Sequence, residues 1–259
     1  MKARIFTGIL ITPLSLWLIY TGELPFFIFV ACLGVIVVLE CAIIIYKRLS
    51  IQGILAAILT AASLTTSYLP QFQAFWGSLF IKTALIVLTI TALLELKTHR
   101  IFLLDSQMLS LLRISILISL TIPFSYLVRD KSDGLFYFLF LCILTWLSDS
   151  FAYFIGKAIG KRKLSTISPN KTVEGSLGGF LVALFFSIGM ISVFSLPVVK
   201  TLLISSLFIL LSQIGDLHES LFKRNFRVKD SSKLLPGHGG IYDRCDSYIF
   251  AMPFAYFFS

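Results

Sequence analysis

Apolar residues along this chain come in long blocks rather than at the one-face spacing of an amphipathic helix. Each block is close to the ~20 residues that a helix needs to cross a bilayer. Because the blocks are unbroken rather than alternating, they exclude a transmembrane β-barrel, and we expect an all-α, polytopic helical bundle. The predicted spans, about nine, are Ile5–Tyr20, Leu24–Tyr46, Gly53–Leu69, Ser78–Leu96, Leu109–Val128, Leu135–Ile155, Leu177–Phe194, Leu196–Ile214 and Gly240–Phe258.

Composition agrees with a membrane protein and changes how the charge is interpreted. Charged residues make up 14% of the chain and hydrophobic residues 57%, whereas soluble proteins carry roughly 25% charged residues. A net charge of +9 would suggest nucleic acid in a soluble protein. In a membrane protein it indicates basic cytoplasmic loops and anionic lipids, so membrane lipids are expected partners and nucleic acid is not.

Basic residues gather in alternate loops, which predicts an orientation. Nine spans with a cytoplasmic N-terminus would place all of these clusters in the cytoplasm. The opposite loops hold little more than Arg129 and Lys131, offset by Asp130 and Asp133. We therefore expect a multi-pass protein of the plasma (inner) membrane. The basic residues that form these cytoplasmic clusters are Lys2, Arg4, Lys47, Arg48, Lys97, Arg100, Lys157, Lys161, Arg162, Lys163, Lys171, Lys223, Arg224, Arg227, Lys229 and Lys233.

The sequence also predicts whether the first span is cleaved and how many domains the chain contains. A basic start followed by an apolar block would also suit a signal peptide, but no small-x-small cleavage site follows Tyr20, so we favour an uncleaved helix. No soluble domain interrupts the pattern. We expect a single membrane domain over residues 1–259, with 1–134 mainly scaffold and 135–259 catalytic.

Seven acidic residues lie in the cytoplasmic halves or at the cytoplasmic ends of the expected spans, where acids are costly and suggest function. An ion pathway would place some near the midplane, so this distribution indicates a cavity open to the cytosol. Each acid could instead simply neutralise a nearby cation, and for Glu40 and Glu95 we give that interpretation at least equal weight. The full set is Glu40, Glu95, Asp149, Asp216, Glu219, Asp243 and Asp246.

For Asp216 and Asp243 the sequence favours a metal site. Asp216 and Glu219 are three residues apart and Lys223 is four further on, so one helical face could carry all three. Hard carboxylate oxygens suit Mg²⁺, which completes its coordination with water and substrate phosphates. The intervening segment is rich in cations that could neutralise a polyphosphate.

A glycine-rich stretch follows these cations. Gly237, Gly239 and Gly240 permit backbone conformations that turn N–H groups toward an anion, and we expect His238 between them to donate to phosphate. Gly240 opens the last span, whose N-terminal dipole favours bound phosphate. The pattern predicts a site for a metal and a polyphosphate.

The stretch from Ser220 to Asp246 resembles the hallmark motif of phosphatidate cytidylyltransferases (CDP-diacylglycerol synthases), namely S-x-x-K-R, K-D and P-G-H-G-G-x-x-D-R-x-D. The stretch from Ser168 to Gly175, with Gly178 and Gly179, is similar to the family's second conserved loop. The segment from Trp146 to Tyr153 resembles its intramembrane Asp segment, although Ser150 stands where Thr or Ala is more frequent. The resemblance is specific over Trp146 to Asp246.

This resemblance implies that CTP and phosphatidic acid give CDP-diacylglycerol and pyrophosphate, in phospholipid biosynthesis. It implies that Asp216 and Asp243 hold Mg²⁺, and that Asp246 and Asp149 complete the shell or bind a second cation. Lys223, Arg224 and Arg244 would neutralise the triphosphate. Lys171 and Lys229 would also contact substrate phosphates, whereas Arg227 and Lys233 better suit anionic headgroups.

Two alternatives stay open at this point. A CTP-dependent polyprenol or phytol kinase shares a similar glycine-rich motif, but the K-R, K-D and D-R-x-D elements weigh against it. An ion-coupled transporter would place charges near the midplane of both halves, which this chain does not do. The expected substrates are CTP and phosphatidic acid, and the prediction also admits a homodimer.

Overall fold

The computed structural model describes residues 2–99, 106–194 and 196–258, and within these ranges the regular structure is helical, with two isolated β-bridges in loops. The all-α expectation is confirmed. Arg100, one of the basic residues used for the expected orientation, lies outside the described residues. The helices are α1 (Lys2–Thr21), α2 (Glu23–Tyr46), α3 (Ile51–Tyr68), α4 (Pro70–Trp76), α5 (Leu79–Thr98), α6 (Gln107–Thr121), α7 (Pro123–Arg129), α8 (Gly134–Ile159), α9 (Val173–Phe194), α10 (Val198–Asn225) and α11 (Tyr242–Phe258).

Every expected span corresponds to a helix, but not every helix has the length of a full span. Six helical segments in the described part are long and apolar enough to cross a membrane. The pair α4–α5, bent by 50°, would make a seventh. With 17 residues, α11 falls short of the ~20 that a straight crossing requires. The chain is thus a multi-pass membrane protein, and the count of nine spans stays a prediction.

Local sequence determines where several helices begin. Ser50, Ser78 and Ser106 each precede a helix, and each hydroxyl accepts a hydrogen bond from the backbone N–H three residues on. Such caps satisfy N–H groups that have no partner within the helix. Pro123 occupies the first turn of α7, where a missing N–H costs nothing, and it divides the expected span Leu109–Val128 into α6 and α7.

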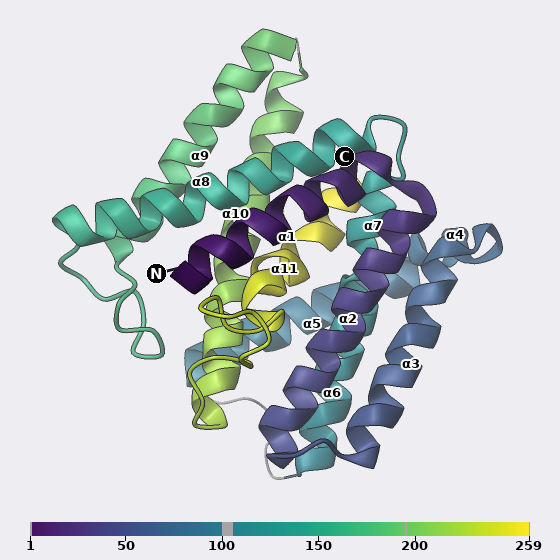
Figure 1. The fold of residues 1–259 in the computed structure, drawn as a ribbon. Coiled ribbons are helices and arrows are strands. Elements are labelled where there is room, and N and C mark those ends of the chain that lie inside the picture. The colour runs from purple at the N-terminus through teal and green to yellow at the C-terminus, as the bar shows by residue number, and fades with distance from the viewer. Residues whose placement is uncertain (1, 100–105, 195, 259) are drawn as a thin grey trace.

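The helices form two groups that meet at α11. Figure 1 shows α2, α3 and α6 side by side on one side of the molecule and α8, α9 and α10 on the other. Helix α11 packs along α10 and also contacts α2, α6 and α7. The two long loops, 160–172 between α8 and α9 and 226–241 between α10 and α11, therefore lie near the start of α11.

Glycines allow the closest helix contacts. A Cβ on Gly179 of α9 would overlap the backbone oxygen of Ser148 in α8, and a Cβ on Gly215 of α10 would overlap that of Asp246 in α11. Small residues of this kind let helix backbones approach one another within membranes. The contact at Gly215 places its neighbour Asp216 beside Asp246, which begins to build the site.

Candidate active site

Three carboxylates from two helices form an acidic cluster. Asp216 and Glu219 lie one turn apart on α10, and Asp246 lies on the first turns of α11. One oxygen of each lies within 4.8 Å of the others. Two ligands of a single Mg²⁺ lie at most about 4.2 Å apart, because each Mg–O bond is about 2.1 Å. A small inward movement would therefore let this cluster hold such an ion, and oxygen donors are the chemistry it prefers.

Asp243 lies next to the cluster and is held by the protein itself. Its Oδ1 accepts a hydrogen bond from Lys223 Nζ at 2.7 Å. Its Oδ2 accepts from the Ser231 backbone N–H at 3.0 Å, the Ser231 hydroxyl at 3.0 Å and the Gly240 N–H at 2.8 Å. Asp243 is not one of the three clustered acids, so its predicted role as a metal ligand stays a prediction.

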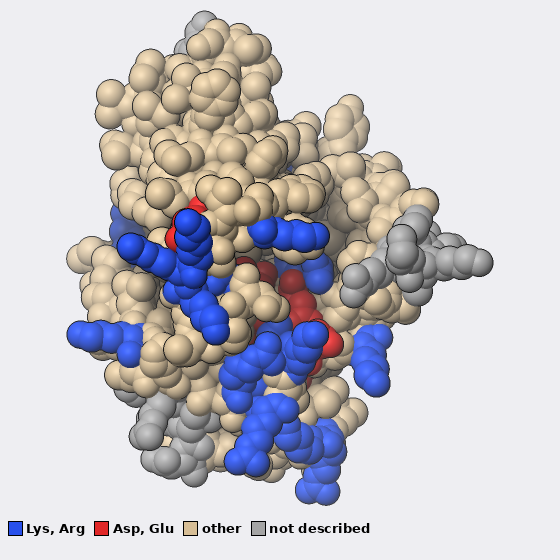
Figure 2. All heavy atoms as spheres, turned by 90° about the vertical axis from the view of Figure 1, so that its left-hand side faces the viewer, with Lys and Arg blue, Asp and Glu red and all other residues tan. Residues whose placement is uncertain are grey.

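Two lysines neutralise the acids. Lys223 Nζ lies 2.8 Å from Glu219 Oε1 as well as 2.7 Å from Asp243, so one ammonium joins both carboxylates. Lys171, in the loop after α8, forms an ion pair with Asp216. Figure 2 shows this face, where Lys and Arg side chains surround a hollow in which acidic atoms are visible.

The hollow itself has a volume of about 380 Å³, and most of the residues that line it are polar or charged. Helices α8, α10 and α11 and the loop after α8 contribute its walls, so segments far apart in the sequence meet there. Six of the residues predicted as functional line it together, namely Asp149, Lys171, Asp216, Asp243, Arg244 and Asp246. Lys223 is not among these lining residues, but it forms an ion pair with one of them, Asp243.

The glycine-rich loop packs against carboxylates. Gly237 and Gly239 have φ of 76° and 83°, a region that disfavours other residues. A Cβ on Gly239 would overlap Asp243, and a Cβ on Gly240 would overlap Ser231 and Glu40. The Gly240 N–H donates to Asp243. In this structure the glycines thus serve close packing around buried acids, and the predicted phosphate contacts remain predictions.

A second, basic hollow of about 530 Å³ lies in the same loop. Lys229, Lys233, His238 and Arg244 contribute to its lining. Arg244 also lines the acidic hollow, so its side chain lies where the two hollows meet. The Arg244 guanidinium donates to the His238 carbonyl through Nη2 at 2.7 Å and Nε at 3.2 Å.

Arg224 is placed apart from these two hollows. Its Nη1 donates to the Val228 carbonyl at 3.0 Å, which holds the chain as it leaves α10. The side chain lines a different depression together with His99 and Ile167. The structure therefore does not bring Arg224 together with the other predicted triphosphate ligands.

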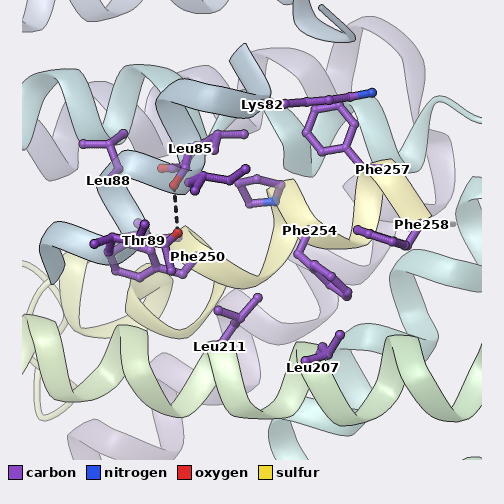
Figure 3. Close-up of a pocket in the computed structure, with 15 residues that line it drawn as sticks. Lys82, Leu85, Leu88, Thr89, Leu207, Leu211, Phe250, Phe254, Phe257 and Phe258 are labelled. Carbon is purple, nitrogen blue, oxygen red and sulfur yellow. Dashed lines mark hydrogen bonds between the residues drawn. The ribbon is translucent and has the colours of Figure 1, made fainter. Parts of the chain in front are cut away.

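A larger, apolar cavity lies in another part of the helical bundle. It has a volume of about 660 Å³ and lies between α5, α6, α10 and α11 (Figure 3). Its described lining is apolar apart from Lys82, Thr89 and Thr121. Lys82 lies over the Phe257 ring, and the Thr89 hydroxyl donates to the Leu85 carbonyl on its own helix at 2.8 Å. Because no acid is among those lining residues, the cavity suits hydrocarbon rather than metal or phosphate chemistry.

Sequence reasoning left out several residues that build the site. Glu219 is among the acids that the sequence singles out, but it receives no role there, although its spacing from Asp216 is the signal that could have placed it in the cluster. Gln213 joins α8, α9 and α10, since it donates to the Ser148 hydroxyl at 3.2 Å and accepts from the Ser176 hydroxyl at 2.5 Å. Ser231 carried no motif signal.

Glu40 and Glu95, the two acids for which the sequence also allowed simple charge neutralisation, have different partners in the structure. Glu95 is fully buried and pairs with Arg113 and with His218, whose Nε2 lies 3.1 Å away. This agrees with neutralisation as its role. Within the part of the chain that the structure describes, no cation pairs with Glu40, which instead accepts hydrogen bonds from the backbone N–H groups of Ile241 and Tyr242, just after the glycine-rich loop.

Known proteins are similar to this chain along nearly its whole length. The pattern that defines the cytidylyltransferase family matches residues 2–259. A phosphatidate cytidylyltransferase of Bacillus subtilis (strain 168) is 38% identical over 267 residues, which cover 99% of this chain and 97% of the relative. That of Staphylococcus haemolyticus is 36% identical and that of Staphylococcus aureus (strain COL) 35%, each covering 98% of this chain and 96% of the relative. The chain therefore belongs to the cytidylyltransferase family.

Proposed function

We propose that this protein is a phosphatidate cytidylyltransferase, which transfers CMP from CTP to phosphatidic acid and releases pyrophosphate. A phosphate oxygen of the lipid attacks the α-phosphorus of CTP, and the bond between the α-phosphorus and the bridging oxygen to the β-phosphorus breaks. Both reactants are anions, so the protein must neutralise and align them. The observation that carries the proposal is the acidic cluster of Asp216, Glu219 and Asp246 with cations around it.

The proposed cofactor is Mg²⁺, held by Asp216 and Asp246 with Glu219 beside them. Bound there, the ion would neutralise negative charge on the substrate phosphates. Asp243 and Asp149 line the same hollow and stay predicted ligands of this ion or of a second cation. Lys171, paired with Asp216 in this structure, lies where it could turn to a substrate phosphate once the ion takes over the carboxylate.

The basic hollow suits the outer phosphates of CTP. Lys229, Lys233 and His238 line it, and Arg244 connects it to the acidic cluster. A triphosphate lying across Arg244 would put its α-phosphorus near the acids and its leaving pyrophosphate near the lysines. Lys233 would then contact phosphate, whereas its sequence-based assignment to anionic headgroups stays a prediction. Lys223 pairs with Glu219 and Asp243 in this structure, and its contact with the triphosphate also stays a prediction.

The active site is proposed to face the cytoplasm, where CTP is available. The basic loops support this orientation. The relatives' names favour neither the lipid kinase nor the transporter. Assembly as a homodimer stays a prediction.

The purified protein, supplied with CTP, dioleoyl phosphatidic acid and Mg²⁺, should release pyrophosphate and form CDP-diacylglycerol. Omission of phosphatidic acid should abolish the release, and a chelator should abolish it until Mg²⁺ is restored. Pyrophosphate release that is independent of the lipid would contradict the proposal, and full activity with excess chelator would contradict its metal site.

A further inference from the structure

Glu40 belongs to α2, in the half of the chain expected to be scaffold, yet it contacts the active-site loop. Its side chain is buried, with 4% of the residue exposed. Four donor groups from residues about 190 to 200 positions later in the chain lie within hydrogen-bond distance of the carboxylate, and one of them, the Ser231 hydroxyl, shares its single proton between Glu40 and Asp243. The donors are Ser231 Oγ at 2.9 Å, Ser232 Oγ at 2.6 Å, Ile241 N at 3.0 Å and Tyr242 N at 2.9 Å.

Two of these donors are the first backbone N–H groups of α11. Such groups have no acceptor inside their own helix and carry the positive end of the helix dipole. The Ile241 and Tyr242 N–H groups are therefore satisfied by a carboxylate that comes from another helix. A buried carboxylate is costly unless it is fully bonded, and these four donors compensate Glu40.

Glu40 is also connected to Asp243. The Ser231 hydroxyl lies 2.9 Å from Glu40 Oε2 and 3.0 Å from Asp243 Oδ2, so one side chain lies between the two acids. Gly240 lies against Glu40 with no room for a Cβ, and its N–H donates to Asp243. Movement of Glu40 would thus displace the loop that orients Asp243 and Arg244 toward the hollow.

We infer that Glu40 is a positioning residue for the transfer reaction. It fixes the 226–241 loop and the start of α11, and through them the side chains of Asp243 and Arg244. It is not among the residues that line either hollow, so it acts through the loop rather than on the substrate. The inference rests on the proposed function, although its effect on the loop can be measured separately.

Substitution by glutamine tests the role because an amide cannot replace this carboxylate. One oxygen of Glu40 faces the Ile241 N–H and the other faces the Tyr242 N–H. Either orientation of a glutamine amide would direct its NH₂ group at a backbone N–H, which can only donate. Glu40→Asp keeps two acceptor oxygens with a shorter reach.

The experiment compares Glu40→Gln, Glu40→Asp and Leu64→Ala in the purified full chain. Leu64 is fully buried in α3, lies against α2 and provides a control for loss of stability alone. For each variant we would measure kcat/KM for CMP transfer, the melting temperature, and hydrogen exchange of the backbone amides over 231–242.

Glu40→Gln should lower kcat/KM about 100-fold, the scale of a misplaced active-site group, and should speed exchange in this segment. Glu40→Asp should recover a large part of both. Leu64→Ala should lower the melting temperature at least as much while leaving segment exchange and kcat/KM close to wild type. Wild-type loop exchange in Glu40→Gln, or an equal loss of activity in Leu64→Ala, would overturn the inference. Absence of CMP transfer by the wild-type protein would instead contradict the proposed function, and the exchange data would still decide the role of Glu40.

Discussion

Lys223 shows how the surroundings of a residue decide which charge is available to a substrate. Its ammonium already joins Glu219 and Asp243, at 2.8 and 2.7 Å. In this structure Lys223 holds the two acids in place, and its contact with the triphosphate stays a prediction. The positive charge available to phosphates then lies in Arg244 and Lys229, which line the hollows, whereas Lys171 must first leave its ion pair with Asp216.

At this scale Asp216 provides the first prediction. Asp216→Asn should lower kcat/KM at least about 100-fold, because an amide is a poor ligand for Mg²⁺ and removes charge from the cluster. Asp133→Asn, the same change at an exposed position before α8, should leave activity near wild type. Adding Asp243→Asn to Asp216→Asn should cause little further loss, since residues that act as one unit are not additive. Purified Asp216→Asn with near-normal kcat/KM at saturating Mg²⁺ would rule out this ligand.

Arg244 and Arg224 form a second matched pair. Arg244→Lys should raise KM for CTP by about 10-fold, because lysine cannot keep both the bonds to His238 and a contact across the two hollows. Arg224→Lys should have a smaller effect, since that side chain lines another depression and bonds to Val228. Steady-state kinetics over a range of CTP concentrations measures both. A larger effect at Arg224 would show that the triphosphate lies elsewhere.

At the scale of elements, the close contact of α10 with α11 brings the acids together. Gly215 faces the backbone of Asp246 with no space for a side chain. The contact lies beside two predicted site residues, Asp216 on α10 and Asp246 on α11, so the spacing of the helices sets the spacing of their carboxylates. Helix packing is therefore part of the active site.

Gly215→Ala tests this dependence. The added methyl group must push α11 away, at a cost of roughly 1–3 kcal/mol in the free energy of unfolding, and should lower kcat/KM and Mg²⁺ affinity together. Gly189→Ala in α9 is the matched control, because a Cβ there meets nothing within 4 Å. It should leave activity and melting temperature at or slightly above wild type. Similar behaviour of the two variants in melting and kinetic assays would contradict the role of the contact.

Helical spacing explains why some site residues could be predicted from the sequence and others could not. Asp216, Glu219 and Lys223 are neighbours because three- and four-residue separations share a helix face. Glu40 lies about 190 residues before Ser231, and only tertiary packing brings them together. The division into a scaffold half and a catalytic half stays a prediction. Glu40 belongs to the first half by position and contacts the second half through its hydrogen bonds.

At the scale of the whole molecule, the two ends of α11 define two faces. Its start carries the acids and the 226–241 loop. Near its other end, Lys131 donates to the Tyr256 carbonyl at 2.5 Å, and Arg129 donates to the Ile19 carbonyl at 2.7 Å. The turn that contains Asp130 therefore lies near the end of α11, whereas the candidate active site lies at its start.

Sidedness follows as a prediction for intact cells. In a background without native cysteines, a cysteine at Asp130 should react with an impermeant thiol reagent from outside, and one at Lys229 should not. Permeabilised cells should label both and provide the control. Labelling at position 229 but not at position 130 would contradict the predicted orientation, because the candidate active site would then face away from cytosolic CTP. The cysteines to be replaced are Cys32, Cys41, Cys142 and Cys245.

Whole-chain features were the most predictable from sequence, because long apolar blocks can form little other than membrane helices. All nine expected blocks are helical. The break between α6 and α7 before Pro123 and the short α4 lie within or beside such blocks, so hydropathy alone does not reveal them. The packing of the 226–241 loop around Asp243 depends on hydrogen bonds that no periodicity encodes.

The most direct test of the central claim follows the two ends of the triphosphate. CTP labelled at the α-phosphorus and CTP labelled at the γ-phosphorus would be supplied separately, with phosphatidic acid and Mg²⁺, and the lipid products resolved by chromatography. A cytidylyltransferase transfers the whole CMP unit, so α-label should enter the lipid and γ-label should appear only in pyrophosphate. Entry of γ-label into lipid would contradict the account and indicate a lipid kinase.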